Sequence, residues 1–545
     1  MNKIFKVVWS KTKECYVVVS EVAKNNGGKK KALASVLAGL AMVAAAGTMG
    51  TSVQADTNLG NSAVNISPNG TYNGSNSVGV NSVVVGYQNK TNNQAGTLAY
   101  GANNTAYGDS AFAIGNNNVA KGGNAYAMGN TAEALGTVAL AFGNQAKALA
   151  NYTVAMGSGA NASNENAVAV GRRTKAAGVA AVGMGLEANA AGDNSVAIGK
   201  NNTTTGGAGG VAIGNTNTST GDRAIAIGEG NKSQKEDTIT MGKSNTASVG
   251  GGIAIGQDNV ANSGGSAGNT MIAIGRQNEA TAQDTIAIGR EAKAKNDLSV
   301  AIGNRTEATA NAAIAIGTNG APDANGNAYK TTASGFAAVA IGMQSNSSGT
   351  ASTAVGGKSS ATAASASAFG REANASAENA TALGYKSAAS VKDGVALGST
   401  SKATVDKGVK GFNPAENRDN KYTGLAGTAQ TSTLAAVSVG DGPIATRQIT
   451  GLAAGTNDTD AVNVAQLRSV NLKYAGDTGK GDVLLDDGTL TVKGEGLLST
   501  EADASGIKLK LKEGDTITDN NGKVVPPTTN GVATTDNVAQ AINRS

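Results

Sequence analysis

The sequence predicts an all-β fold, a parallel β-solenoid whose coils are fourteen residues long. From Gly86 to Gly398 the pattern apolar-x-apolar-Gly, usually VAIG or IAIG, recurs 22 times. Of the 21 intervals between the closing glycines, 17 are fourteen residues, two are fifteen, one is nineteen and one is twenty-five. Helix-pair, propeller and leucine-rich repeats need about 20–50 residues, so a fourteen-residue unit predicts one turn of a β-solenoid.

The composition also favours small, repeated cores over large globular ones. Aromatic residues make up only 3% of the chain, 76 residues are Gly, and the apolar content comes mostly from Ala, Val and Ile. Few aromatics are also typical of disordered chains, but here β-branched residues recur at fixed places, which favours order.

Strand periodicity assigns two faces to each coil. In the segment Ser195 to Gly199, alternation places Val196 and Ile198 on one face and Ser195 and Ala197 on the other. We expect the large pair to fill the coil interior and the small face to approach a neighbouring subunit. The same interior position is expected for Ile213, Ile227, Ile255, Ile274, Ile288, Ile302 and Ile316.

The rest of each coil predicts two corners and a second short strand. Turn-forming residues follow the closing glycines, as at Asn116 to Asn118 and at Asn201 and Asn202, and a short alternation such as Thr306 to Ala310 comes next. Glu187 is expected at an exposed corner. One such coil buries little surface, so stability must come from stacking and oligomerisation.

Two intervals carry extra residues, five between Gly256 and Gly275 and eleven between Gly317 and Gly342. We expect both insertions to leave the coil at a corner and rejoin the same stack. Insertions in solenoids map to loops, often on a binding face. Neutral drift in a surface loop explains them equally well.

The N-terminus has the features of a secretory signal peptide. Three lysines at 29 to 31 precede an apolar run from Ala32 to Met49 and an A-x-A-like site, which predicts cleavage between Ala55 and Asp56. A transmembrane anchor is the alternative, but the run is near the minimum length of about 18 residues and rich in Ala and Gly.

Three segments resemble known families. The first, MNKIFKVVWSKTKECYVVVSEVAKNNGGKKK, resembles the extended signal peptide region of large autotransporters. The motif NSVAIG at Asn194 to Gly199, with its fourteen-residue period, is similar to the YadA-like head of trimeric autotransporter adhesins. This resemblance implies left-handed parallel β-rolls packed as a homotrimer, type V secretion and a location at the cell surface or outer membrane.

The third segment is ATRQITGLAAGTNDTDAVNVAQLRSV, Ala445 to Val470, which looks like the family's neck leading into a coiled coil. Here Asp460 is expected to be the N-cap of a helix that carries Val464 and Leu467 on one face. Beyond it we expect strands at Asp482 to Leu485, Thr489 to Val492 and Ile507 to Leu511. A second coiled-coil start is expected near the C-terminus, because Val538 and Ile542 lie four residues apart.

These observations divide the chain into six segments. They are an extended signal peptide (1–55), a β-roll head (56–398), a head-to-neck transition (399–444), a neck and coiled-coil start (445–472), a small β-containing stalk domain (473–533) and the start of a second neck (534–545). The resemblance implies a C-terminal membrane anchor of amphipathic strands, and no such segments are present. We expect a fragment of a longer protein, with a truncated, released product as the alternative.

Composition argues against catalysis. The chain has no His, and its single Cys and single Trp are Cys15 and Trp9. Ser-His-Asp triads, Cys nucleophiles and His/Cys sites for zinc or copper are therefore not expected downstream. A polysaccharide-cleaving solenoid would need paired carboxylates, whereas Glu187, Glu229 and Glu307 are dispersed over corners. We expect no catalytic, cofactor-binding or metal-binding residues.

The function that the resemblance implies is multivalent attachment to extracellular matrix proteins, host cells or other bacteria. The net charge of +5 is scattered, and we expect no aromatic-plus-basic cluster of the kind that binds nucleic acid. The alternative is a passive fibre or spacer, or a self-association protein in biofilm or shielding. The sequence assigns no ligand-binding residues.

Overall fold

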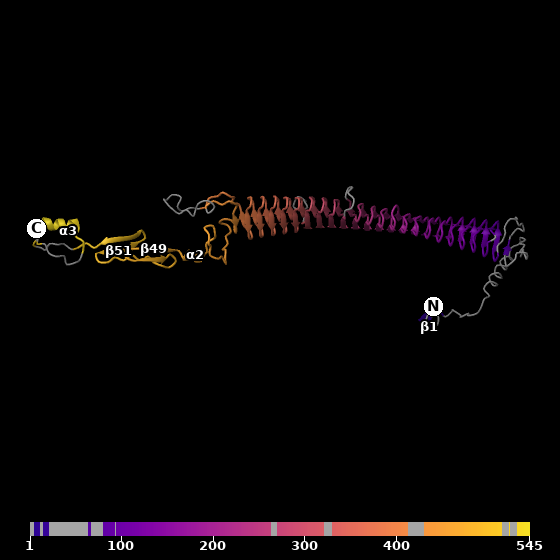
Figure 1. The fold of residues 1–545 in the computed structure, drawn as a ribbon, viewed down its shortest axis with the longest axis horizontal. Coiled ribbons are helices and arrows are strands. Elements are labelled where there is room, and N and C mark those ends of the chain that lie inside the picture. The colour runs from indigo at the N-terminus through magenta and orange to yellow at the C-terminus, as the bar shows by residue number, and fades with distance from the viewer. Residues whose placement is uncertain are drawn as a thin grey trace. The chain divides into compact units, whose positions relative to one another are not determined.

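The computed structural model describes residues 5–10, 15–20, 64–66, 80–92, 94–262, 270–320, 330–411, 430–514, 521, 523 and 531–544. The chain divides into two compact units, Met1–Lys402 and Ala403–Ser545 (Figure 1). Near the N-terminus, β1 (Phe5–Ser10) and β2 (Cys15–Ser20) form an antiparallel hairpin. The expected cleavage residues Ala55 and Asp56 lie outside the described residues.

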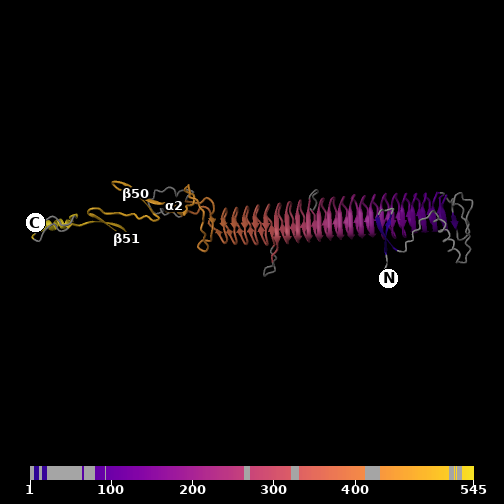
Figure 2. The ribbon, with the colours of Figure 1, turned by 90° about the horizontal axis from the view of Figure 1, so that it is seen from below.

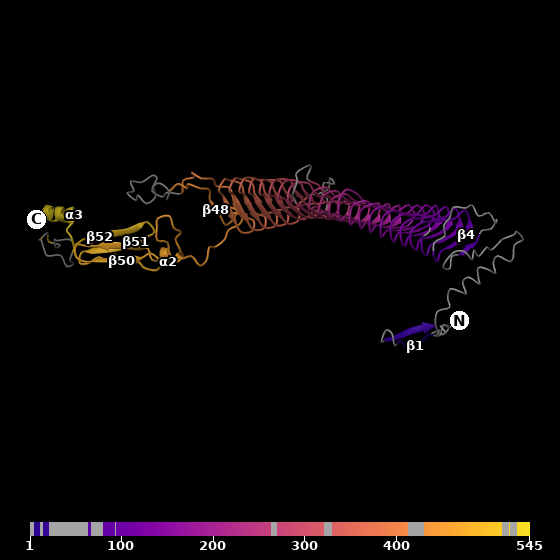
Figure 3. The same cartoon turned by 45° about the vertical axis from the view of Figure 1, so that its right-hand side comes forward.

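The fourteen-residue repeat forms a solenoid of two parallel sheets, visible as a regular stack in Figures 2 and 3. Each coil contributes one long strand to the first sheet and one two-residue strand to the second sheet. The long strands are β3 (Val64–Ile66), β4 (Val83–Tyr87), β6 (Leu98–Ala102), β8 (Phe112–Asn116), β10 (Tyr126–Asn130), β12 (Leu140–Phe142), β14 (Val154–Met156), β16 (Val168–Val170), β18 (Val182–Leu186), β20 (Val196–Lys200), β22 (Val211–Asn215), β24 (Ile225–Glu229), β26 (Ile239–Lys243), β28 (Ile253–Gln257), β30 (Ile272–Arg276), β32 (Ile286–Arg290), β34 (Val300–Asn304), β36 (Ile314–Thr318), β38 (Val339–Ile341), β40 (Thr353–Val355), β42 (Ser367–Phe369), β44 (Thr381–Leu383) and β46 (Val395–Leu397).

The short strands alternate with the long ones along the chain. They are β5 (Lys90–Thr91), β7 (Thr105–Ala106), β9 (Val119–Ala120), β11 (Glu133–Ala134), β13 (Lys147–Ala148), β15 (Asn161–Ala162), β17 (Lys175–Ala176), β19 (Asn189–Ala190), β21 (Thr203–Thr204), β23 (Thr218–Ser219), β25 (Lys232–Ser233), β27 (Thr246–Ala247), β29 (Val260–Ala261), β31 (Glu279–Ala280), β33 (Lys293–Ala294), β35 (Glu307–Ala308), β37 (Thr332–Ala333), β39 (Asn346–Ser347), β41 (Ser360–Ala361), β43 (Asn374–Ala375), β45 (Ala388–Ala389) and β47 (Lys402–Ala403). The predicted all-β solenoid is confirmed.

Equivalent residues of successive coils pair in register, as Val196 does with Val211 and Ile198 with Ile213. We call the turn from a long strand to the next short strand the first corner, and the turn back to the following long strand the second corner. The two insertions leave the register intact, since Ile255 still pairs with Ile274 and Ile316 with Ile341. The first insertion lies at a second corner, between β29 and β30, and the other at a first corner, between β36 and β37.

The coil interior is lined by small residues, which corrects the predicted facing. Ser195 and Ala197 are fully buried, whereas Val196 and Ile198 are only half-buried and point outward. The same correction applies to Ile213, Ile227, Ile255, Ile274, Ile288, Ile302 and Ile316. Within each coil the two sheets lie so close that almost every side chain between them is Ala, Ser, Thr or Asn. The larger Val and Ile side chains therefore lie on the outer surface of the coil in the single chain.

Asparagine forms a buried ladder inside the solenoid. The backbone and side-chain N–H groups of Asn217 donate to Oδ1 of Asn202 at 2.9 and 3.0 Å, and its Nδ2 also lies 2.6 Å from the carbonyl oxygen of Gly228. The longest run is Asn202, Asn217, Asn231, Asn245, Asn259 and Asn278, and a shorter one is Asn89, Asn104 and Asn118. Asn118 and Asn202 are therefore interior residues, while their neighbours Asn117 and Asn201 make the corner with φ of 55°.

The closing glycine is needed for two separate reasons. Gly199 has φ of +115°, a conformation that side chains disfavour. A Cβ built on it would also lie 2.1 Å from the carbonyl oxygen of Gly214 in the next coil. The repeated glycine therefore allows the coils to stack at strand spacing.

In its described residues, the second unit contains two hairpins and two short helices. The helices are α2 (Val464–Arg468) and α3 (Thr535–Arg544), and the strands are β48 (Val437–Ser438), β49 (Asn471–Ala475), β50 (Lys480–Leu484), β51 (Leu498–Asp503) and β52 (Gly506–Leu511). β49 pairs with β50 and β51 with β52, both antiparallel. The strand expected at Thr489 to Val492 is absent, and β49 and β51 were not expected. Among the residues that the structure describes, no helix is long and apolar enough to cross a membrane.

Candidate functional site

The outer surface of the first sheet is a continuous apolar face. It consists of two columns, one through Val196 and one through Ile198, that run the length of the stack because the coils pair in register. The Ile198 column is entirely apolar and holds Val85, Tyr100, Ile114, Met128, Phe142, Met156, Val170, Met184, Ile198, Ile213, Ile227, Met241, Ile255, Ile274, Ile288, Ile302, Ile316, Ile341, Val355, Phe369, Leu383 and Leu397. The sequence-predicted core residues are thus brought together, but on a surface of the single chain.

This apolar face is incompletely covered in one chain. Met184 is 41% exposed and Leu383 is 45% exposed. Soluble monomers rarely expose contiguous apolar patches of more than a few hundred Å², and larger ones mark interaction sites. The Val196 column is apolar as well, except at Thr353, Ser367 and Thr381. An apolar face of this length is suited to burial against another apolar surface.

The outer surface of the second sheet is mostly polar. Its central column consists of the first residue of each short strand and includes Lys175, Asn189, Lys293, Glu307 and Asn346. The second residue of each short strand, usually Ala, is buried between the sheets. Each coil therefore has an apolar outer face, a polar outer face and two corners.

Ion pairs run along the stack between equivalent corner positions. Arg173 lies 3.0 Å from Glu187 of the next coil, and Arg305 lies 2.7 Å from Glu291 of the preceding one. The hydrogen bond from Arg305 lowers the pKa of Glu291, and the positive charges of Arg290 and Arg276 act in the same direction. Glu187 is exposed at a corner, as expected, with φ of 57°.

One cation–aromatic cluster was missed by the sequence reasoning because its members come from adjacent coils. The Tyr385 ring lies 5.5 Å from the Arg371 guanidinium carbon and 5.2 Å from Lys386 Nζ. Hydrogen bonding to Tyr385 and the charge of Glu372 raise the pKa of Lys386. Both cations also contact Glu372, at 2.9 and 3.6 Å. A single ring with two cations is no series of stacking platforms for bases, so this cluster is not of the kind that binds nucleic acid.

The neck helix begins three residues later than expected. The N-cap of α2 is Asn463, whose Oδ1 accepts from the backbone of Gln466 at 2.8 Å, and the Gln466 side chain accepts from Asn463 in return. Asp460 instead accepts from the backbone of Thr456 and Asn457, and these bonds lower its pKa. Val464 and Leu467 are each 66% exposed in the single chain.

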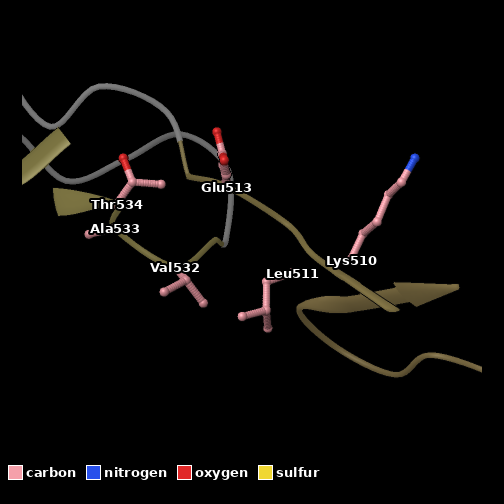
Figure 4. Close-up of a pocket in the computed structure, with 6 residues that line it drawn as sticks. All are labelled: Lys510, Leu511, Glu513, Val532, Ala533 and Thr534. Carbon is pink, nitrogen blue, oxygen red and sulfur yellow. The ribbon is translucent and has the colours of Figure 1, made fainter. Parts of the chain in front are cut away.

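A shallow hollow lies between the end of β52 and the start of α3 in the described residues of the second unit (Figure 4). Lys510, Leu511, Glu513, Val532, Ala533 and Thr534 line it. The backbone of Val532 donates to the carbonyl of Lys512 at 2.9 Å and holds the two segments together. In the described parts of the chain, no three His, Cys, Asp or Glu residues are grouped to hold a metal ion. One carboxylate beside one ammonium supplies no set of groups for acid–base chemistry.

Comparison with known families agrees with this geometry. The YadA head domain repeat matches ten segments between residues 93 and 387, and the coiled stalk of trimeric autotransporter adhesin matches residues 448–487. The extended signal peptide of the type V secretion system matches residues 1–48. The chain belongs to the trimeric autotransporter adhesins. Such an adhesin is an exported, cell-surface, non-enzymatic protein, and the family implies a homotrimer.

A curated relative of this adhesin is the autotransporter adhesin BadA of Bartonella henselae, 36% identical over 107 residues. The match covers 19% of this chain and 3% of BadA. This adhesin therefore spans only a small part of its relative's length.

Proposed function

We propose that three copies of this adhesin bury their apolar faces against one another and present their polar faces and corners for multivalent attachment. The apolar face carries this proposal, since each coil is too small to cover its own valines and isoleucines. Burying apolar surface contributes about 25 cal/mol per Å². Repetition over the whole stack therefore favours association of complete heads.

The proposed ligands are extracellular matrix proteins, host-cell receptors or surfaces of other bacteria. Three equal surfaces with repeated coils raise the effective concentration of each weak contact once the first has formed. Val464 and Leu467 would then lie in a three-stranded coiled coil, which accounts for apolar side chains that are exposed in one chain. Signal cleavage between Ala55 and Asp56 completes the proposed route to the surface.

Binding of the purified full chain to immobilised collagen, fibronectin and laminin, to host cells and to itself tests the proposal. We expect saturable binding to at least one of them, with a slow dissociation rate. Ile198→Asp places a charge on the apolar face, and we expect it to lower the trimer fraction and the apparent affinity together. Lys175→Gln, on the polar face two coils earlier, is the control for trimer formation. Trimers that bind none of these surfaces would support a passive spacer instead.

A further inference from the structure

The two corners of the solenoid carry opposite net charge, although the second corners also contain Lys121, Lys235 and Lys295 close to the positions counted below. We define the first edge as the two residues after each closing glycine, and the second edge as the positive-φ residue of each second corner with the residue before it. The first edge holds ten cations and five acids, namely Arg172, Arg173, Lys200, Lys243, Arg276, Arg290, Arg305, Lys358, Arg371 and Lys386 against Glu187, Glu229, Asp258, Glu291 and Glu372. The second edge holds two cations and ten acids, namely Arg223 and Lys392 against Asp109, Glu165, Asp193, Asp222, Glu236, Asp237, Asp284, Asp297, Glu378 and Asp393.

Ion pairs within the chain do not remove this difference. On the first edge, the acids Glu187, Glu229, Glu291 and Glu372 pair with cations of the same edge. On the second edge, the two cations pair with Asp237 and Glu378. After these pairs are formed, the first edge keeps an excess of positive charge and the second edge an excess of negative charge.

Cations and acids also lie at matching levels of the stack. Arg172 follows Glu165 by seven residues, Lys200 follows Asp193 by seven, and Lys243 follows Glu236 by seven. Arg290 follows Asp284 by six residues, and Arg305 and Lys386 follow Asp297 and Glu378 by eight. Seven residues are half a coil, so each pair sits on opposite sides of one coil. Its members belong to different corners and cannot meet within one chain.

Corner chemistry alone does not account for the acids. Oδ1 of Asp193 accepts from the backbone of Val179 at 2.8 Å, but neutral Asn151 accepts from Thr137 in the same way at 2.9 Å. An uncharged amide side chain would therefore accept the same backbone hydrogen bond at these corners. Glu165 makes no such bond, and its side chain is exposed.

We infer that the first edge of each protomer docks on the second edge of the next protomer, so that inter-subunit ion pairs set the axial register of the trimer. This inference rests on the proposed burial of the apolar faces around a threefold axis. In a ring with cyclic symmetry the contacts are heterologous, and one edge meets the other edge of its neighbour at the same level. Opposite charges there attract, and a slip by a coil would misalign them.

Charge exchange at Arg172 and Glu165 tests the inference on the full chain. Neither side chain forms an ion pair within the described part of the chain, so effects inside one protomer should be small. Arg172→Glu and Glu165→Arg should each lower the melting temperature of the trimer by several degrees. The double variant should recover at least half of that loss. In 1 M salt, where the screening length is about 3 Å, the single variants should approach the parent protein.

Lys175→Glu is the matched control, because it makes the same charge change in the same coil on the polar face. It should leave the melting temperature unchanged. Absence of rescue in a trimeric double variant would overturn the edge contact alone, whereas a monomeric parent protein would overturn the apolar-face trimer as well. If Arg172→Glu left the melting temperature unchanged but weakened retention on heparin, the first edge would bind an external polyanion. That result would overturn the contact between subunits.

Discussion

Neighbouring asparagines in this adhesin have different structural roles. Asn201 takes a left-handed corner conformation, with φ of 55°, and Asn202 beside it points inward and joins the buried ladder. In the ladder, one Oδ1 receives both a backbone and a side-chain N–H of the next coil. The ladder therefore satisfies polar groups at a place that water does not reach, and it couples each coil to the next.

Removing one rung should be costly. We expect Asn231→Ala to lower the stability of the trimer by about 1–3 kcal/mol per chain, because it removes the acceptor of the backbone and side-chain N–H groups of Asn245 and the donor to the carbonyl of Gly242. Asn144→Ala, at an exposed corner position, is the control and should change little. Thermal or chemical denaturation would measure both. Equal effects would show that the ladder contributes nothing specific.

Asp460 gives a pH prediction for the neck turn. Its pKa is lowered by the backbone hydrogen bonds from Asn457 and Thr456. The stabilisation is therefore fully present above the ordinary Asp value of about 3.9 and is lost as the pH falls through the lower, folded-state value. Hydrogen exchange of the Thr456 and Asn457 amides should accelerate in this acid range, relative to the intrinsic rate. Asp460→Asn should abolish that acceleration, and a turn that opens near neutral pH would contradict the assignment.

At the scale of the element, each long strand separates two kinds of packing. Its inward residues are small and lie between sheets, while its outward residues are large and form the apolar face. In β20, Ala197 therefore packs inside the coil, and Ile198 lies on the apolar face that the proposed trimer would bury. Substitutions on the two faces should have separable effects.

We expect Ala197→Leu to disrupt the coil itself, because three extra heavy atoms cannot fit between the sheets; overpacking in a core costs about 1–3 kcal/mol. Ile198→Asp should weaken association more than it perturbs the coil. Circular dichroism and sedimentation velocity together would separate these outcomes. Glu187→Gln, which alters only an exposed ion pair with Arg173, is the control and should be nearly silent. A stable trimer with Leu at position 197 would refute the narrow interior.

At the scale of the whole molecule, the head is a stack that tolerates insertions because each coil bonds only to its neighbours. The pairing of Ile316 with Ile341 across the second insertion shows this tolerance. Deleting residues 322 to 329 should therefore preserve trimer formation and melting temperature. Analytical ultracentrifugation and thermal melts would check this. An unfolded head would show that the segment belongs to the scaffold.

The sequence by itself determined the coil length, the number of coils, the parallel pairing and the family. The coil length, number and pairing follow from the glycine period, which holds in 17 of 21 intervals, because each repeat adds one strand to the stack. The family follows from the resemblance of three segments. Alternation along Ser195 to Ile198 likewise defined two faces. It did not say which face lies inside, and the prediction that Val196 and Ile198 fill the interior was wrong.

Only the tertiary structure decided the facing, because the gap between the two sheets is a property of the closed coil and not of any strand. That gap admits Ala197 and excludes Ile198. The same holds for the ladder, where the corner dihedral at Asn201 turns Asn202 inward, and for the neck, where the local turn around Asp460 moves the helix start to Asn463. In each case, contacts made only in the folded chain decide between neighbouring residues that the repeat pattern does not distinguish.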